Sequence, residues 1–256
     1  MAAPDVTFVH SLFRSGSTYI YNALKRSEHL HVYHEPMHEV IASLPNSWSE
    51  LSGRKDQLKS MLRHDFLIGC YFDEFSHLLP SIKKTFDPKF SFDYYFMEAG
   101  GSAPDLKAYI DLLVDGAPRP PVLQCTRTSG RIAWLKENYK SNHVFLLRNP
   151  WDQWYSYKVD PYIATTPRII YSQSNLPEVL RAVFEASGAL QLIGCHTQEK
   201  LVFGFKLPLT PDQDYFLFFG LWLYSFGYCN WGIPRYFERN SWSFTTHNIL
   251  YWRETS

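Results

Sequence analysis

The order of strand-forming and helix-forming segments constrains the fold of this 256-residue chain more than any other feature. Residues 6–12 are β-branched and apolar, and they lead through a polar turn with one glycine into a helical pattern at 19–26. Further strands are predicted at 30–33, 122–126 and 143–147, and helices at 104–114, 132–139 and 151–158. Parallel strands need crossover connections, which are usually helical. The sequence therefore predicts an α/β fold with a central parallel sheet flanked by helices.

Apolar spacing predicts three more helices, at 54–66, 178–192 and 215–229. The last of these is the longest apolar run, but it is shorter than the roughly 20 residues that a membrane-spanning helix needs. We therefore expect a buried helix there and no membrane span. No repeat, linker or composition break divides residues 1–256, which predicts a single domain. The turn-rich segment 160–210 is expected to form a wall or lid over a site at the strand ends.

Charge and cysteine content narrow the class of protein. The chain has 25 basic and 25 acidic residues, so no net field attracts nucleic acid, and any anion site must be local. Four separated cysteines form no CxxC pair, and the first residues lack the basic and apolar regions of a signal peptide. We therefore expect a cytoplasmic protein that has no nucleic-acid partner. The sequence gives no indication of oligomeric state.

The turn after the first strand carries groups that bind an oxyanion. Residues 11–18, SLFRSGST, place backbone N–H groups at a helix N-terminus beside hydroxyls and the guanidinium of Arg14. Gly16 allows a ligand to approach the backbone closely. Ser17 stands where the ATP-binding motif GxxxxGK[ST] has its lysine, which disfavours magnesium-dependent ATP hydrolysis. The alternative interpretation is that Ser15 and Ser17 only cap the helix.

A second motif predicts another anion contact. Residues 143–156, HVFLLRNPWDQWYS, put Arg148 at a strand end and Ser156 eight residues later, in a helix that starts at a proline. Both side chains can then contact one anion. The alternative is that Arg148 forms a surface ion pair. Arg127 and Arg131, after the strand at 122–126, fit either phosphate binding or surface pairing equally well.

These motifs together resemble sulfotransferases that use 3′-phosphoadenosine 5′-phosphosulfate (PAPS), most closely the carbohydrate-type and bacterial branches with their P-loop-like fold. The resemblance lies in RSGST after the first strand, Glu35-Pro36 after the second, and LLRNP followed by Ser156. It covers residues 6–38 and 120–158, with a looser match at a Leu-Trp-Leu helix around residue 222. It implies metal-free transfer of a sulfuryl group from PAPS, as co-substrate, to a hydroxyl of a small molecule or carbohydrate.

The resemblance also implies a role for each matching residue. The 5′-phosphosulfate would contact Arg14, Ser15, Gly16, Ser17 and Thr18. Arg148 and Ser156 would hold the 3′-phosphate, and Arg14 would stabilise charge that develops on the leaving phosphate. Glu35 would be the general base, with the neighbouring His34 in reserve. The alternative for Glu35 is a carboxylate that caps the following helix.

Two alternative functions stay open. Residues 34–38, HEPMH, match the zinc-hydrolase pattern HExxH, but Pro36 biases Glu35 away from helical angles, so the two histidines would not share a helix face. The other alternative is a homologue that binds the nucleotide without turnover. It arises because no basic loop near the C-terminus is recognisable, although Arg235, Arg239 and Arg253 are present there.

Overall fold

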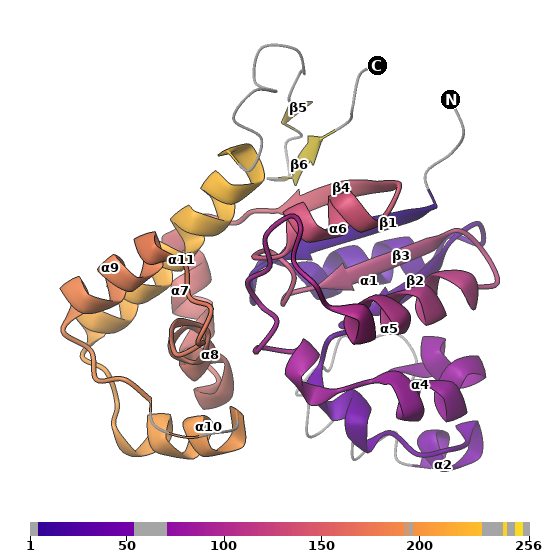
Figure 1. Ribbon diagram of the computed structural model, residues 1–256, viewed down its shortest axis with the longest axis horizontal. Helices are drawn as coiled ribbons and strands as arrows, with labels where there is room; N and C mark the ends of the chain where they lie inside the picture. Colours follow the sequence, from indigo (N-terminus) through magenta and orange to yellow (C-terminus); the bar gives the residue numbers. More distant parts are fainter. Residues whose placement is uncertain are drawn as a thin grey trace.

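The structure is a computed structural model that describes residues 5–53, 71–192, 194, 197–231, 243–244 and 249–252. Two parts are visible in Figure 1: a sheet with its covering helices, and a group of helices from α7 to α11 beside it. No helix among the described residues is long and apolar enough to cross a membrane.

Four parallel strands form the centre of the sheet. They are β1 (Val6–Ser11), β2 (His31–His34), β3 (Pro121–Cys125) and β4 (Ser141–Leu146). Within the described chain the sheet order is β2-β3-β1-β4-β6-β5. The strand β6 (Ile249–Trp252) is antiparallel to β4, and β5 (Ser243–Phe244) is antiparallel to β6. The predicted α/β class with a parallel central sheet is confirmed, and its antiparallel edge is an addition.

Helices connect and cover these strands. They are α1 (Ser17–Lys25), α2 (Trp48–Gly53), α4 (Leu79–Thr85), α5 (Pro104–Asp115), α6 (Ile132–Asn138), α7 (Pro150–Tyr157), α8 (Pro161–Tyr171), α9 (Glu178–Ser187), α10 (Thr197–Lys206) and α11 (Pro211–Trp231), with 3-10 turns η1 (Glu39–Ser43), η2 (Asp73–Leu78) and η3 (Pro88–Phe90). Each helix predicted within the described residues is present, although α9 ends early, at Gly188 in the left-handed region. The helix predicted at 54–66 lies outside the described residues.

The described residues of the segment 160–210 form three helices, where the sequence predicts only one. Asp160 caps α8 by accepting a hydrogen bond from the backbone N–H of Tyr162, and Pro161 occupies the first turn. Asp160 and Pro161 therefore start a helix within the segment that the sequence describes as rich in turns. Pro167 lies inside α8, where sequence reasoning expects a break. Burial of Ile169 and Ile170 in the helical part offsets that preference.

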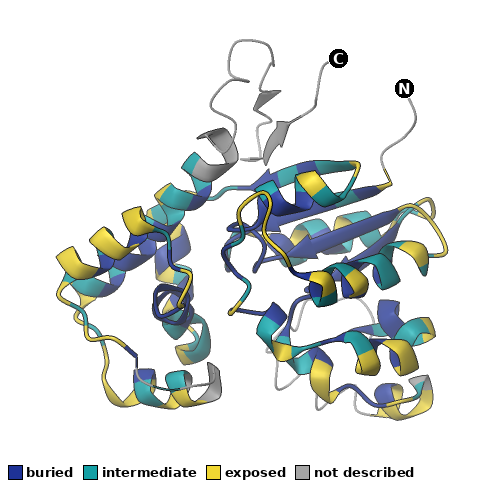
Figure 2. Ribbon diagram, viewed as in Figure 1, coloured by how far each residue is buried: buried dark blue, intermediate teal, exposed yellow. Residues whose placement is uncertain are grey.

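The described residues form three apolar cores. One packs against the sheet and includes Phe8 and Leu123, a smaller one lies between the sheet and α1, and the third lies between α7, α8, α9 and α11. The expected buried helix, α11, is buried along one side only (Figure 2). Leu217 is fully buried, whereas Phe216 and Leu223 are 45% and 47% exposed. Part of this apolar run is therefore exposed on the surface of the molecule.

Candidate functional site

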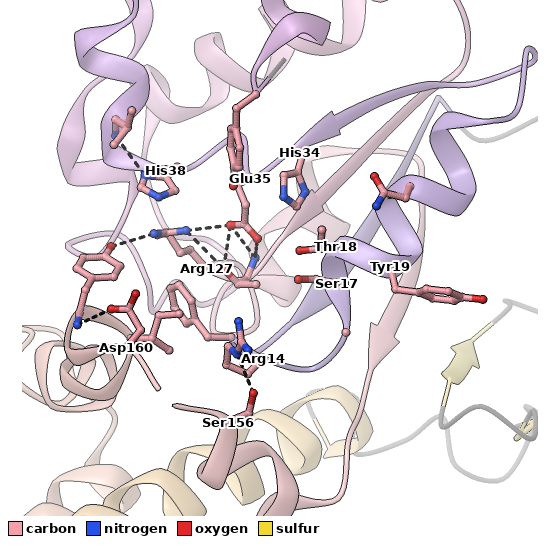
Figure 3. Close-up of a pocket in the computed structure, with 18 of the residues that line it drawn as sticks. Arg14, Ser17, Thr18, Tyr19, His34, Glu35, His38, Arg127, Ser156 and Asp160 are labelled. Atoms are coloured by element: carbon pink, nitrogen blue, oxygen red, sulfur yellow. Dashed lines mark hydrogen bonds and ion pairs between the residues drawn. The ribbon is translucent and has the colours of Figure 1, made fainter. Parts of the chain in front are cut away.

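A cavity of about 650 Å³ lies at the carboxyl ends of the parallel strands and is bounded on one side by α7 and α8 (Figure 3). Ligands of open α/β sheets bind at this edge. Among its lining residues are Arg14, Gly16, Ser17, Thr18, His34, Glu35, Arg148 and Ser156. The structure thus brings together every residue predicted for the site except Ser15, which lies beside the cavity lining.

The turn after β1 has the backbone shape of an anion cradle. Arg14 (φ 61°) and Gly16 (φ 93°) both adopt left-handed backbone angles, which direct successive N–H groups to one side. Gly16 is the N-cap of α1, and no side chain caps that helix, so the predicted alternative of a serine cap is wrong. Within the described chain, the buried hydroxyl of Ser15 has no hydrogen-bond partner. The N–H groups at this helix start, which no side chain caps, fit an oxyanion ligand.

Arg14 and Arg148 lie together beside this turn. The Nε of Arg14 donates to the hydroxyl of Ser156 at 2.8 Å, and Nη1 of Arg148 donates to the carbonyl oxygen of Arg14 at 3.1 Å. The indole of Trp222, in the Leu-Trp-Leu helix, donates to the carbonyl oxygen of Arg148 at 3.1 Å. All of these contacts are to uncharged oxygens, so none of them neutralises the positive charge of Arg14 or Arg148. The two strand-end motifs therefore form one basic end of the cavity.

Glu35 is buried and its carboxylate is surrounded by donors. Its backbone is left-handed (φ 50°), and its N–H donates to the carbonyl oxygen of Gln124 on the neighbouring strand at 2.8 Å. Its Oε2 accepts from Thr126 Oγ1 at 2.8 Å and from Arg127 Nη1 at 2.9 Å. The Thr126 N–H lies 3.2 Å from both carboxylate oxygens. The carboxylate is thus held in one orientation, and it does not act as the helix cap considered as an alternative.

Arg127 is a buried cross-link, which the sequence did not predict. It is 1% exposed, and its guanidinium lies over the rings of Phe13 and Phe92. It pairs with Glu35 at 2.9 Å and with Glu39 at 3.3 Å. The expectation of surface pairing for Arg127 is therefore wrong. Arg131 is also buried and donates to a backbone carbonyl rather than to a surface partner.

The α8 wall joins this network through Tyr162. Its hydroxyl donates to Glu39 Oε1 at 2.5 Å and accepts from Arg127 at 3.1 Å. Burial alone would raise the pKa of Glu39, but His38, Arg127 and the Tyr162 hydrogen bond together lower it to about 2. Burial lowers the pKa of His38 to about 4, so the imidazole is neutral at pH 7. At pH 7 the positive charge that pairs with the Glu39 carboxylate is therefore that of Arg127 and not that of His38. The predicted wall over the site is present, because Asp160 and Tyr162 line the cavity.

The HEPMH segment is not a helix. His34 ends β2, Glu35 is left-handed, and His38 is the extended N-cap of η1, where its Nδ1 accepts from the backbone N–H of Val40. The two histidines therefore lack the shared helix face that gives HExxH its meaning. In the part of the chain that the structure describes, no group of three or more potential ligands could hold a metal ion.

Sequence reasoning missed one more residue of the cavity, Tyr19, and a buried residue that contacts its lining, Gln124. Tyr19, at the start of α1, lines it and is 74% exposed, which suits stacking on a planar base. Its position next to the glycine turn is a signal that could have found it. Gln124 is fully buried on β3, and nothing local marks it as functional. Arg235, Arg239 and Arg253, considered for a C-terminal basic loop, lie outside the described residues.

Comparison with family models, curated proteins and solved structures returned no match to this chain.

Proposed function

We propose that this protein is a group transferase that binds a doubly phosphorylated nucleotide in the cavity at the strand ends. One observation carries the proposal: the glycine turn and the LLRNP motif, 134 residues apart, meet where Arg148 donates to the Arg14 carbonyl. Two guanidinium groups, uncapped helix N–H groups and Ser156 then offer contacts for two separate anionic groups.

Among such transferases, the activity that we propose is that of a PAPS-dependent sulfotransferase. PAPS carries a 5′-phosphosulfate for the turn at residues 14–18 and a 3′-phosphate for Arg148 and Ser156. In the reaction, an acceptor hydroxyl oxygen bonds to sulfur while the bond from sulfur to the leaving phosphate oxygen breaks. Arg14 stabilises the negative charge that develops on that oxygen. Positioning of the reactants and stabilisation of charge provide most of the rate acceleration, as in phosphoryl transfer.

Two side chains can take the proton of the acceptor hydroxyl. The sequence resemblance favours Glu35, with His34 in reserve. The Glu35 carboxylate already accepts from Thr126 and pairs with Arg127, so taking up a proton there would disrupt an ion pair. We therefore assign the general base to His34, which also lines the cavity. Glu35 instead holds the surrounding side chains in place. The acceptor is a small-molecule or carbohydrate hydroxyl.

Titration calorimetry with 3′-phosphoadenosine 5′-phosphate, the desulfated product, tests donor binding. We expect micromolar binding by the wild type and at least a tenfold loss in Arg14→Ala and in Arg148→Ala. Arg181→Ala is the matched control, because this exposed arginine donates to the backbone carbonyl of Leu176, just before α9, and does not line the cavity. Absence of binding by the wild type would remove the proposal.

Transfer of radiolabelled sulfate from PAPS to a panel of sugars and small alcohols then tests turnover. Labelled product that is lost in Arg14→Ala and His34→Asn supports a sulfotransferase. Donor binding without transfer to any acceptor favours the alternative of a nucleotide-binding homologue without turnover.

A further inference from the structure

We propose that Gln124 is a positioning residue that holds His34 in one tautomer, with the proton on Nδ1 and the acceptor lone pair on Nε2. The catalytic part of this inference rests on the proposed function, whereas the tautomer itself does not. Gln124 is fully buried on β3, directly opposite His34 of β2 in the parallel register.

Three contacts connect Gln124 to its surroundings. Its side-chain oxygen lies 2.5 Å from His34 Nδ1, and its side-chain nitrogen donates to Glu35 Oε1 at 3.4 Å. Glu35 is in turn paired with Arg127 at 2.9 Å. With Tyr162 of the α8 wall bonded to Arg127, these four side chains form a continuous chain of contacts from that wall to the imidazole that lines the cavity. Figure 3 shows the part of this chain from Arg127 to Glu35.

Glu35 decides which way the Gln124 amide faces. An ionised carboxylate can only accept hydrogen bonds, so it requires the amide nitrogen of Gln124 on its side. The amide oxygen then faces His34, and an oxygen acceptor requires a proton on Nδ1. In a neutral imidazole Nε2 is then the acceptor nitrogen. With the amide reversed, its nitrogen could still donate to an unprotonated Nδ1 of His34, but two acceptor oxygens would face each other at Glu35. The contact with Glu35 therefore sets the orientation.

The ring of His34 is also held against rotation. It stacks on Tyr21, with the ring centres 4.4 Å apart, and contacts Tyr71 at 5.4 Å. Its backbone N–H donates to the carboxylate of Glu74 at 2.8 Å, and the Tyr21 hydroxyl donates to the same carboxylate at 3.1 Å. A ring flip would therefore cost packing as well as the contact with Gln124. The tautomer that free histidine favours in water has its proton on Nε2, so the protein must impose the other one.

Nitrogen NMR of the imidazole tests the tautomer without reference to activity. In protein labelled with ¹⁵N-histidine, the resonances of His34 are identified by their loss in His34→Asn. At pH 7.5 we expect the wild type to show a protonated Nδ1 and an unprotonated Nε2. In Gln124→Met, which has a similar volume and no acceptor oxygen, the pattern should move toward a protonated Nε2. A protonated Nε2 in the wild type, or no change in Gln124→Met, would overturn the inference.

Kinetics test the consequence for catalysis. Gln124→Met should lower kcat at least tenfold, while the affinity for 3′-phosphoadenosine 5′-phosphate stays within twofold of wild type. Gln173→Met is the matched control: it also removes a buried glutamine amide, which donates to the Ile169 carbonyl at 2.9 Å in α8. It should leave both quantities and the His34 resonances unchanged. An equal loss of kcat in the two variants would mean that Gln124 acts through stability alone. A wild type that binds no nucleotide would instead remove the proposed function and leave the NMR result standing.

Discussion

The Nε of Arg14 and the Oγ of Ser156 are joined by a 2.8 Å hydrogen bond, although the two residues lie 142 positions apart in the chain. This bond links the glycine turn after β1 to the first turns of α7. The proposed function gives these two side chains different phosphate groups of one nucleotide. Donor binding would therefore exchange this contact for contacts to the ligand.

Ser156→Ala tests whether this hydroxyl takes part in donor binding. A hydrogen bond to a charged group contributes about 1.5 kcal/mol, so we expect the dissociation constant for 3′-phosphoadenosine 5′-phosphate to rise about tenfold. Calorimetry measures it. Ser187→Ala serves as control, because its hydroxyl, at the end of α9, bonds only to backbone groups among the described residues, the Phe184 carbonyl and the Ala189 N–H. Equal affinities in Ser156→Ala and wild type would exclude Ser156 from the site.

Arg148→Met tests the assignment of the 3′-phosphate. The wild type should bind 3′-phosphoadenosine 5′-phosphate far more tightly than adenosine 5′-phosphate, which lacks that group. Loss of the guanidinium should reduce this preference at least tenfold while affinity for the 5′-phosphate alone changes little. Competition binding with the two nucleotides measures the ratio. A ratio unaffected by Arg148→Met contradicts the assignment.

Gly16→Ala tests the importance of the left-handed backbone at residue 16, because the site has room for a methyl group. A Cβ on Gly16 would meet no atom within 4 Å, so the substitution is opposed only by the left-handed angle φ 93°. We expect a loss of about 1 to 2 kcal/mol in the free energy of unfolding, together with weaker nucleotide binding as the turn changes shape. Urea denaturation and calorimetry measure the two effects.

Gly188→Ala is the control for that variant. Gly188 also has a left-handed backbone (φ 64°), but it ends α9 away from the cavity. Its substitution should lower stability by a similar amount and leave nucleotide affinity unchanged. If Gly16→Ala binds the nucleotide as tightly as Gly188→Ala does, the shape of the turn at Gly16 does not matter for nucleotide binding.

A buried histidine pair should make the protein acid-sensitive. His10 Nε2 lies 2.8 Å from His143 Nδ1 between β1 and β4. Burial lowers the pKa of His10 from 6.5 to about 3 and that of His143 well below 6.5. Below pH 6.5 the unfolded chain binds these protons and the folded chain does not. Stability is therefore complete above about pH 6.5 and falls toward pH 3, by up to about 1.4 kcal/mol per pH unit for each histidine.

The double variant His10→Phe, His143→Phe removes both titrating groups and keeps two stacked aromatic rings. Urea unfolding between pH 4 and pH 7.5 should show a shallower loss of stability in this variant than in the wild type. His29→Gln, at an exposed histidine, is the control. Parallel curves for wild type and double variant would show that the pair does not cause the acid sensitivity.

Several features of the site were predictable because they are local. Residues 11–18 form a turn at the end of a strand, and Arg148 lies in the short link between β4 and α7, the helix that contains Ser156. Such arrangements depend on neighbouring residues and backbone angles. The glycine turn, the strand ends and the proline at the start of α7 thus follow from short stretches of sequence. The order of strand and helix along the chain also predicted the class of fold.

Only the tertiary structure decided which of these stretches meet. β3 lies between β2 and β1, and this order puts Gln124 opposite His34 and Arg127 against Glu35, about 90 residues away in each pair. No local pattern distinguishes a buried glutamine or arginine with a partner from an exposed one. Their roles arise because burial removes water and leaves the neighbouring side chain as the partner for each polar group.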